Sequence, residues 1–283
     1  MTGTVPFPSI IDAHHHVWDP AIRHQPWLDS AEELTPLRRR FGLDQLAPLA
    51  AAAGVAGTVV VQTVTEPGET PELLALAAAG PLVAGVVGWT DLTAPGSADA
   101  LAGLRELPGG NFLTGIRHPL LTEPDEHWLA RPAVRQGLAA VAAAGLAFDL
   151  VLDPARLPSA VAAAAAVPGL TFVLDHLGNV EVKASPDATW AASFAALAEL
   201  PNAVCKLSGI LSAPVAEVRP YFALALAKFG PDRLMFGSDW PVCTLNAQYA
   251  EVVAAARTLT ADLSMAEQEA ILAGTARRVY RLA

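Results

Sequence analysis

The chain has 283 residues, of which 53% are hydrophobic and only 16% charged, and its formal net charge is −10 at pH 7. This acidic balance, without clustered lysine and arginine, argues against a nucleic-acid partner. No uncharged apolar stretch reaches the roughly 18–20 residues that a membrane span needs. Met1–Pro8 lacks the basic flank and apolar core of a signal sequence, which predicts cytoplasmic residence.

Short apolar, β-branched runs alternate with alanine- and leucine-rich runs along the whole chain. Strands are expected at 10–16, 57–62, 83–89, 112–118, 147–152, 170–176, 203–209 and 234–240. Helices are expected near 44–53, 70–79, 98–106, 131–144, 156–166, 188–199, 214–229 and 247–258. Repeated strand–helix pairs predict an α/β fold, a (β/α)8 TIM barrel formed by a single domain over residues 1–283. An open doubly wound sheet is the alternative, but no Gly-x-Gly-x-x-Gly turn follows the first strand.

The first predicted strand ends in His14-His15-His16. Because side chains alternate along a strand, His14 and His16 are expected on one face and His15 on the other. Two imidazoles on one face can bind a divalent metal or a polar substrate. The long connection over 17–43 is expected to form part of the substrate pocket's wall.

Polar side chains collect at the carboxyl ends of the predicted strands, where barrel enzymes have their active sites. These residues are His14, His16, Gln62, Trp89, Arg117, His118, Asp175, His176, Lys206, Ser208 and Asp239. Arg117 and His118 are adjacent and cannot both point inward. We expect Arg117 to reach the mouth, with an ion pair to Asp91 or Asp149 as the structural alternative.

Five motifs in this order resemble the amidohydrolase superfamily, in particular its TIM-barrel lactonases. They are Ile11–Asp19, Gly115–Pro119, Phe172–Gly178, Cys205–Gly209 and Phe236–Pro241. The resemblance implies that His14 and His16 are metal or substrate ligands and that His176 contributes to catalysis. It implies that Asp239 is the general base and, in metal-bearing members, also a ligand.

The expected cofactor is one divalent metal, most simply zinc, because imidazoles and a carboxylate suit that ion. The chain lacks the bridging lysine or glutamate at a middle strand that the superfamily's two-metal members have, so a two-metal site is not expected. Some lactonases that the chain resembles work without metal, and metal-independent catalysis therefore remains an alternative.

The leading functional hypothesis is hydrolysis of a small-molecule lactone, most simply a sugar aldonolactone, to its hydroxy acid. Arg117, Trp89, Gln62, Trp18 and Trp240 are the expected substrate-binding residues. No Gly-x-Ser-x-Gly nucleophile elbow occurs in the chain, which argues against a serine hydrolase. The alternatives are a decarboxylase acting on an unsaturated or aromatic acid, and a binding protein that has lost its chemistry. The oligomeric state is left open.

Overall fold

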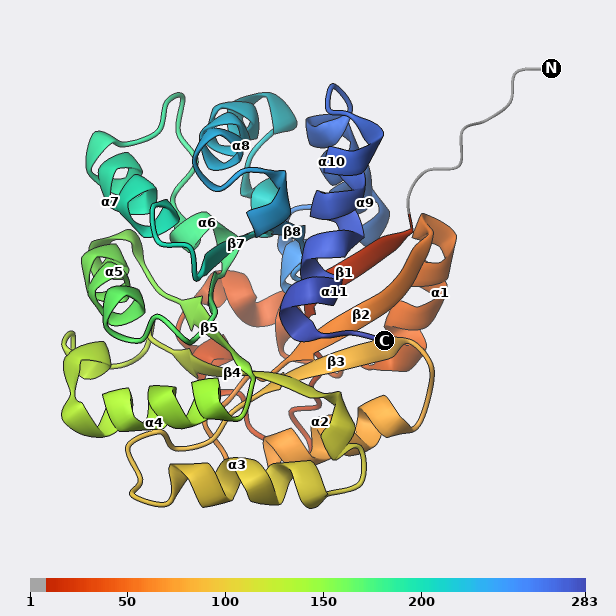
Figure 1. Cartoon of the computed structure of the whole chain (residues 1–283). Coiled ribbons are helices and arrows are strands. Elements are labelled where there is room, and N and C mark those ends of the chain that lie inside the picture. Colours follow the sequence, from red (N-terminus) through yellow and green to blue (C-terminus); the bar gives the residue numbers. More distant parts are fainter. Residues whose placement is uncertain (1–8) are drawn as a thin grey trace.

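The computed structural model describes residues 9–283, so the expectations for Met1–Pro8 lie outside it. The described strands form one parallel sheet in sequence order, which confirms the predicted (β/α)8 barrel (Figure 1). They are β1 (Ile10–His15), β2 (Val55–Val61), β3 (Val83–Gly88), β4 (Leu113–Pro119), β5 (Ala147–Val151), β6 (Phe172–Leu174), β7 (Ala203–Leu207) and β8 (Leu234–Phe236).

Helices surround the barrel and pack their apolar faces against the outside of the sheet (Figure 1). They are α1 (Leu43–Ala53), α2 (Glu69–Ala78), α3 (Ser97–Glu106), α4 (Pro132–Ala143), α5 (Leu157–Ala166), α6 (His176–Asn179), α7 (Ala188–Ala198), α8 (Val215–Phe229), α9 (Tyr249–Thr260), α10 (Met265–Glu269) and α11 (Thr275–Tyr280). Among the described helices, none has both the length and the apolar character that a membrane crossing requires.

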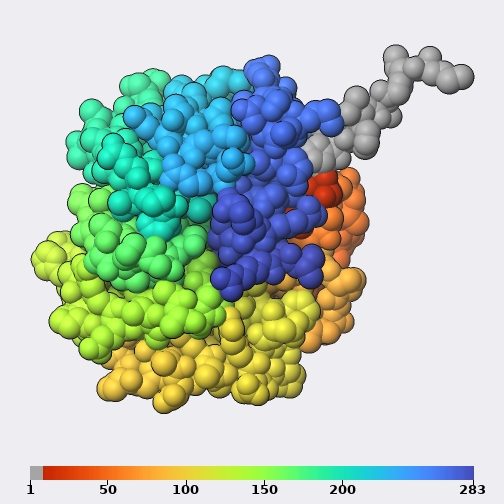
Figure 2. Space-filling model, in the orientation of Figure 1, coloured from red at the N-terminus to blue at the C-terminus, as the bar shows by residue number. Residues whose placement is uncertain are grey.

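The inside of the barrel is filled by a separate apolar cluster. Its members are Ile11, Ala13, Val59, Val61, Val87, Ala147, Val173, Val204 and Met235 from the strands, with Ala273, Ala276 and Tyr280 from the C-terminal segment. Helix α11 lies across the end of the barrel at which the strands begin, and in the space-filling view its residues cover the centre of that face (Figures 1 and 2). The opposite end, where the strands finish, therefore holds the polar residues.

The barrel closes where β1 meets the segment after β8. The Asp239 backbone N–H donates to the His14 carbonyl oxygen at 2.8 Å, and the His16 N–H donates to that of Trp240 at 2.7 Å. Below this junction the buried Asp12 carboxylate accepts hydrogen bonds from the Ser238 N–H at 2.8 Å and the Ser238 hydroxyl at 2.6 Å. These contacts hold the ends of the first and last strands side by side.

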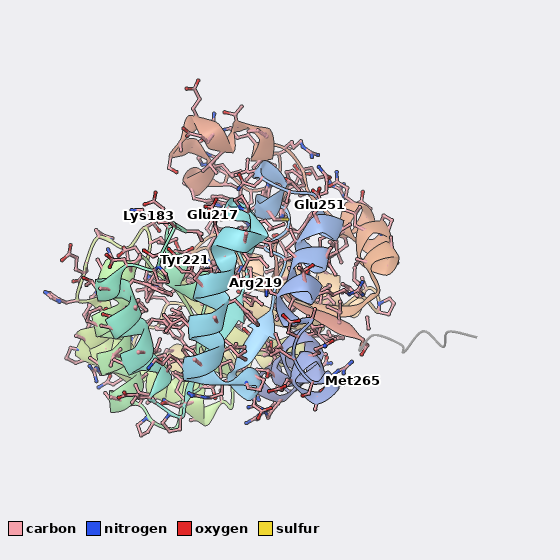
Figure 3. The ribbon with its side chains drawn as sticks, turned by 90° about the horizontal axis from the view of Figure 1, so that it is seen from above. Lys183, Glu217, Arg219, Tyr221, Glu251 and Met265 are labelled. Carbon is pink, nitrogen blue, oxygen red and sulfur yellow. The ribbon has the colours of Figure 1, made fainter. Side chains whose placement is uncertain are left out.

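The connection over 17–43 contains two 3₁₀ turns, Pro26–Asp29 and Glu32–Leu37. In Figure 3 this segment, in faded red, projects from one end of the barrel, whereas the labelled Met265 on α10 lies toward the other end. The long connection thus belongs to the same end as the carboxyl termini of the strands.

Candidate active site

Four predicted site residues meet at the carboxyl end of the barrel. The His14 Nε2 atom lies 3.1 Å from the His16 Nε2 atom and 3.7 Å from an Asp239 carboxylate oxygen. That same oxygen is 3.6 Å from His16 Nε2, and the rings of His14 and His176 have centroids 4.5 Å apart. The structure therefore brings together three imidazoles and one carboxylate from β1 and from the ends of β6 and β8.

This arrangement provides ligands for a metal ion. One ligand atom each from His14, His176 and Asp239 lies within 4.8 Å of the others. Burial lowers the pKa of His14 well below its usual value, lowers that of His16 to about 3, and lowers that of His176. Neutral imidazoles and a carboxylate are the donor set that zinc prefers, so the residues present fit the expected metal.

Asp239 and His176 occupy left-handed backbone conformations, with φ values of 58° and 52°. Such conformations are costly for residues other than glycine and concentrate at functional sites. Both residues lie just beyond shorter strands than the sequence predicts, since β6 ends at Leu174 and β8 at Phe236. The His176 ring is also held by a 2.8 Å hydrogen bond between its Nδ1 atom and the Ser208 hydroxyl.

Asp239 has the environment of a proton acceptor. Its side chain is 12% exposed. Burial raises its pKa, and the neighbouring His176 and Arg117 oppose that shift. A carboxylate that holds a proton more tightly than an exposed aspartate is a better general base near neutral pH.

Arg117 points into the barrel but is already paired. One guanidinium nitrogen lies 3.2 Å from an Asp175 carboxylate oxygen, and another donates to the Gln62 side-chain oxygen at 3.1 Å. The structural alternative, an ion pair of Arg117 with Asp91 or Asp149, named the wrong partner, because Asp175 holds this position. Gln62 orients the arginine, and direct contact of either residue with substrate remains a prediction.

His118 turns away from Arg117, as expected. Its ring stacks on Trp128 with centroids 3.9 Å apart, and its Nε2 atom lies 3.0 Å from the Glu123 carboxylate. The half-buried Trp89 donates its indole N–H to His118 Nδ1 at 3.3 Å. His15 also lies away from the site, with its Nε2 atom 2.9 Å from the Thr58 hydroxyl.

Trp18 and Trp240 are buried against Phe41. The Phe41 ring centroid is 5.4 Å from that of Trp18 and 5.6 Å from that of Trp240. The ring centroids of Trp18 and His16 are 6.4 Å apart, so Trp18 lies close to the candidate site. The two tryptophans have well-defined packing roles, and their contact with substrate stays a prediction.

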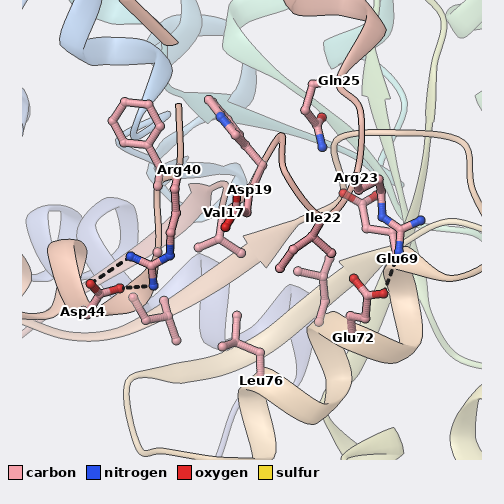
Figure 4. Close-up of a pocket in the computed structure, with 15 residues that line it drawn as sticks. Val17, Asp19, Ile22, Arg23, Gln25, Arg40, Asp44, Glu69, Glu72 and Leu76 are labelled. Atoms are coloured by element: carbon pink, nitrogen blue, oxygen red, sulfur yellow. Dashed lines mark hydrogen bonds and ion pairs between the residues drawn. The ribbon is translucent and has the colours of Figure 1, made fainter. Parts of the chain in front are cut away.

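The connection over 17–43 lines a cavity of about 380 Å³ together with α1 and α2 (Figure 4). Ion pairs between Arg40 and Asp44 and between Arg23 and Glu72 flank it, at 2.6 Å each. Within the described part of the chain, its lining includes Trp18 but neither the three imidazoles nor Asp239. This cavity therefore lies beside the candidate site rather than at it.

Sequence reasoning missed a group of charged residues beneath the site. Asp149, Asp175 and Lys206 are completely buried, and the Lys206 ammonium lies 2.5 Å from Asp149 and 3.0 Å from Asp175. The Tyr280 hydroxyl donates to Asp149 at 2.8 Å. Asp175 and Lys206 were recognisable as polar residues near strand ends, but the sequence does not show that they lie together with Asp149.

Comparisons with known proteins identify relatives of this chain. The amidohydrolase family model matches residues 11–282. An L-fucono-1,5-lactonase of Burkholderia ambifaria is 36% identical over 85% of this chain and 83% of its own length. The L-fucono-1,5-lactonase of Burkholderia multivorans is 35% identical over 96% of each chain.

A crystal structure of a Burkholderia multivorans amidohydrolase with bound zinc superposes with a TM-score of 0.90. It is 35% identical and covers 97% of this chain and 99% of its own. Together with the family match, this likeness confirms the expectations of a TIM-barrel amidohydrolase and of a hydrolytic enzyme. The chain belongs to the amidohydrolase family.

Proposed function

We propose that this protein hydrolyses a small sugar lactone, most simply an aldonolactone, to the open hydroxy acid. The observation that carries the proposal is one buried carboxylate of raised pKa, Asp239, facing the neutral imidazoles of His14, His16 and His176. The names of the two Burkholderia lactonases support this substrate class. Cytoplasmic residence and a single domain over 1–283 remain predictions from the sequence.

In the proposed mechanism, Asp239 accepts a proton from water while the water oxygen bonds to the lactone carbonyl carbon. His176, whose Nδ1 atom is engaged by Ser208, leaves Nε2 for the substrate, and the nearby Arg117 cation stabilises the oxyanion. When the ring C–O bond breaks, Asp239 returns the proton to the leaving oxygen. A divalent metal held by His14, His176 and Asp239, with His16 beside them, would supply Lewis-acid polarisation of the carbonyl.

Neutral polyhydroxylated lactones are expected to be hydrolysed faster than dicarboxylate lactones. Arg117 and Lys206 are both paired with buried carboxylates, which offset much of their positive charge, so the site has little net charge with which to attract additional substrate carboxylates. The test is a panel of five- and six-membered sugar lactones, dicarboxylate lactones and aromatic acids, followed by proton release and by carbon dioxide release. Carbon dioxide release without lactone opening would establish the decarboxylase alternative, and a dicarboxylate preference would overturn the neutral sugar as substrate.

Zinc titration of metal-depleted protein is expected to saturate at one ion per chain. The described ligand atoms form one cluster, in which His14, His176 and Asp239 share a single centre. Elemental analysis after gel filtration measures the stoichiometry, and the variant His176→Gln should weaken the binding. Two ions bound per chain would contradict the one-metal assignment.

A further inference from the structure

Lys206 makes three contacts at the base of the candidate site. Its ammonium nitrogen lies 2.5 Å from Asp149 Oδ2, 3.0 Å from Asp175 Oδ1 and 3.0 Å from His14 Nδ1. The side chain is completely buried, so water does not compete for these contacts. An ammonium group has three hydrogens and no acceptor. Lys206 therefore donates, and the Nδ1 atom of His14 accepts.

This contact determines which nitrogen of the neutral His14 ring carries the proton. If Nδ1 accepts from Lys206, the proton lies on Nε2. The neighbouring His16 has its Nδ1 atom 2.7 Å from the Val61 carbonyl oxygen, which only accepts, so His16 Nε2 is bare. The 3.1 Å contact between the two Nε2 atoms is then a hydrogen bond from His14 to His16. These three contacts, all of 3.1 Å or less, agree on one arrangement of protons, whereas the longer 3.5 Å approach of the Arg117 donor to His14 Nε2 favours the opposite one.

Metal binding through His14 Nε2 requires the opposite tautomer. A metal needs the Nε2 lone pair, which is available when the proton lies on Nδ1 and is donated to an acceptor. Asp175 Oδ1 lies 3.4 Å from His14 Nδ1 and is placed to accept it. His14 Nδ1 therefore has two alternative partners, the donor Lys206 at the shorter distance and the acceptor Asp175 at the longer one.

We propose that Lys206 is a positioning residue that holds His14 in the Nε2–H tautomer and thereby weakens metal binding at the candidate site. For a metal ion to bind at His14 Nε2, the hydrogen bond from Lys206 to His14 Nδ1 must break. Nδ1 must then carry the proton and donate it to Asp175. Tyr280 from α11 supports this arrangement, because its hydroxyl donates to the same Asp149 oxygen that accepts from Lys206. The inference rests on the site proposed above, but it concerns binding and protonation, so a protein without lactonase activity still tests it.

Zinc affinity separates this role from a simple charge effect. The variant Lys206→Met is expected to bind zinc about 10–100-fold more tightly in competition with a chromophoric chelator, the range over which hydrogen-bond partners of metal ligands act. Because losing a positive charge would also favour zinc, the decisive variant is Lys206→Met combined with Asp149→Asn. It removes one charge of each sign and should still bind at least about tenfold more tightly. Affinity equal to the wild type in this double variant would overturn the proposal.

The tautomer itself is measurable in the full-length wild type. Nitrogen-15 NMR of histidine-labelled, metal-depleted protein distinguishes protonated from bare ring nitrogens, and His14→Gln identifies the His14 signals among the seven histidines. We expect a bare Nδ1 and a protonated Nε2 in the wild type, reversed when zinc is added. A wild-type His14 that already carries its proton on Nδ1 would refute the assignment, whether or not the Lys206 variants fold.

Discussion

Replacing Asp239 by asparagine is expected to lower turnover of the best lactone by roughly 10²–10⁴-fold, the range typical for loss of a general base. Asparagine keeps the shape of the side chain but cannot accept a proton from water. The hydrogen bond from the backbone N–H of residue 239 to the His14 carbonyl oxygen does not involve the side chain. It is therefore kept in the variant, and the barrel should stay closed. Steady-state kinetics together with circular dichroism check both halves of this expectation.

The pH profile gives an independent test of the same residue. Because burial raises the pKa of Asp239, the proton-accepting form is lost as the pH falls through a value above the 3.8 of an ordinary aspartate. The pH dependence of turnover should therefore show an acid limb above that value. Asp99→Asn, on the exposed surface of α3, is the matched control and should leave rate and profile unchanged. Near wild-type turnover in Asp239→Asn would show that another group is the base.

Replacing Asp175 by asparagine is expected to reduce the free energy of unfolding by about 3–5 kcal/mol, because breaking a buried ion pair leaves its partners uncompensated. Asp175 is the carboxylate between Arg117 and Lys206, at 3.2 and 3.0 Å. Urea denaturation of the variant and of Asp99→Asn measures the difference. A loss below about 1 kcal/mol, the range of exposed pairs, would contradict the buried network.

The same network predicts how stability depends on pH. Burial raises the pKa of Asp175, but the neighbouring groups, with the Lys206 cation first among them, outweigh that effect and hold the pKa well below 3.8. A carboxylate whose pKa is lower in the folded state stabilises the protein at pH values above its pKa in the unfolded state. This stabilisation is lost as the pH falls through the pKa in the folded state. The wild type should therefore lose more stability than Asp175→Asn on acidification below about pH 4.

The barrel was predictable because its strands are short apolar runs separated by alanine-rich helices. The four residues His14, His16, His176 and Asp239 were predictable because strand ends of a barrel converge. The side-chain direction of Asp175 was not predictable: strand alternation would place it on the face opposite His176, whereas both side chains lie next to His14. The chain leaves β6 at Leu174 and His176 turns left-handed, so alternation no longer applies and both side chains reach the barrel interior.

The buried charges were harder still to predict. Asp149, Lys206 and Tyr280 lie on β5, β7 and α11, and only the folded barrel brings them into contact. A single polar residue in an apolar strand is compatible with solvent contact, an ion pair or catalysis. The sequence shows each residue but not its partner, and the partner determines which of these roles it has.

The hydrogen bonds that close the barrel have a consequence for refolding. The backbone of His14 pairs with that of Asp239, and the side chains of these same residues face each other in the candidate site. Contacts between segments so distant in sequence form slowly, because a long loop must first be closed. During refolding, catalytic activity should therefore recover together with closure of the barrel and later than helix content. The rate of turnover then reports when the fold is complete.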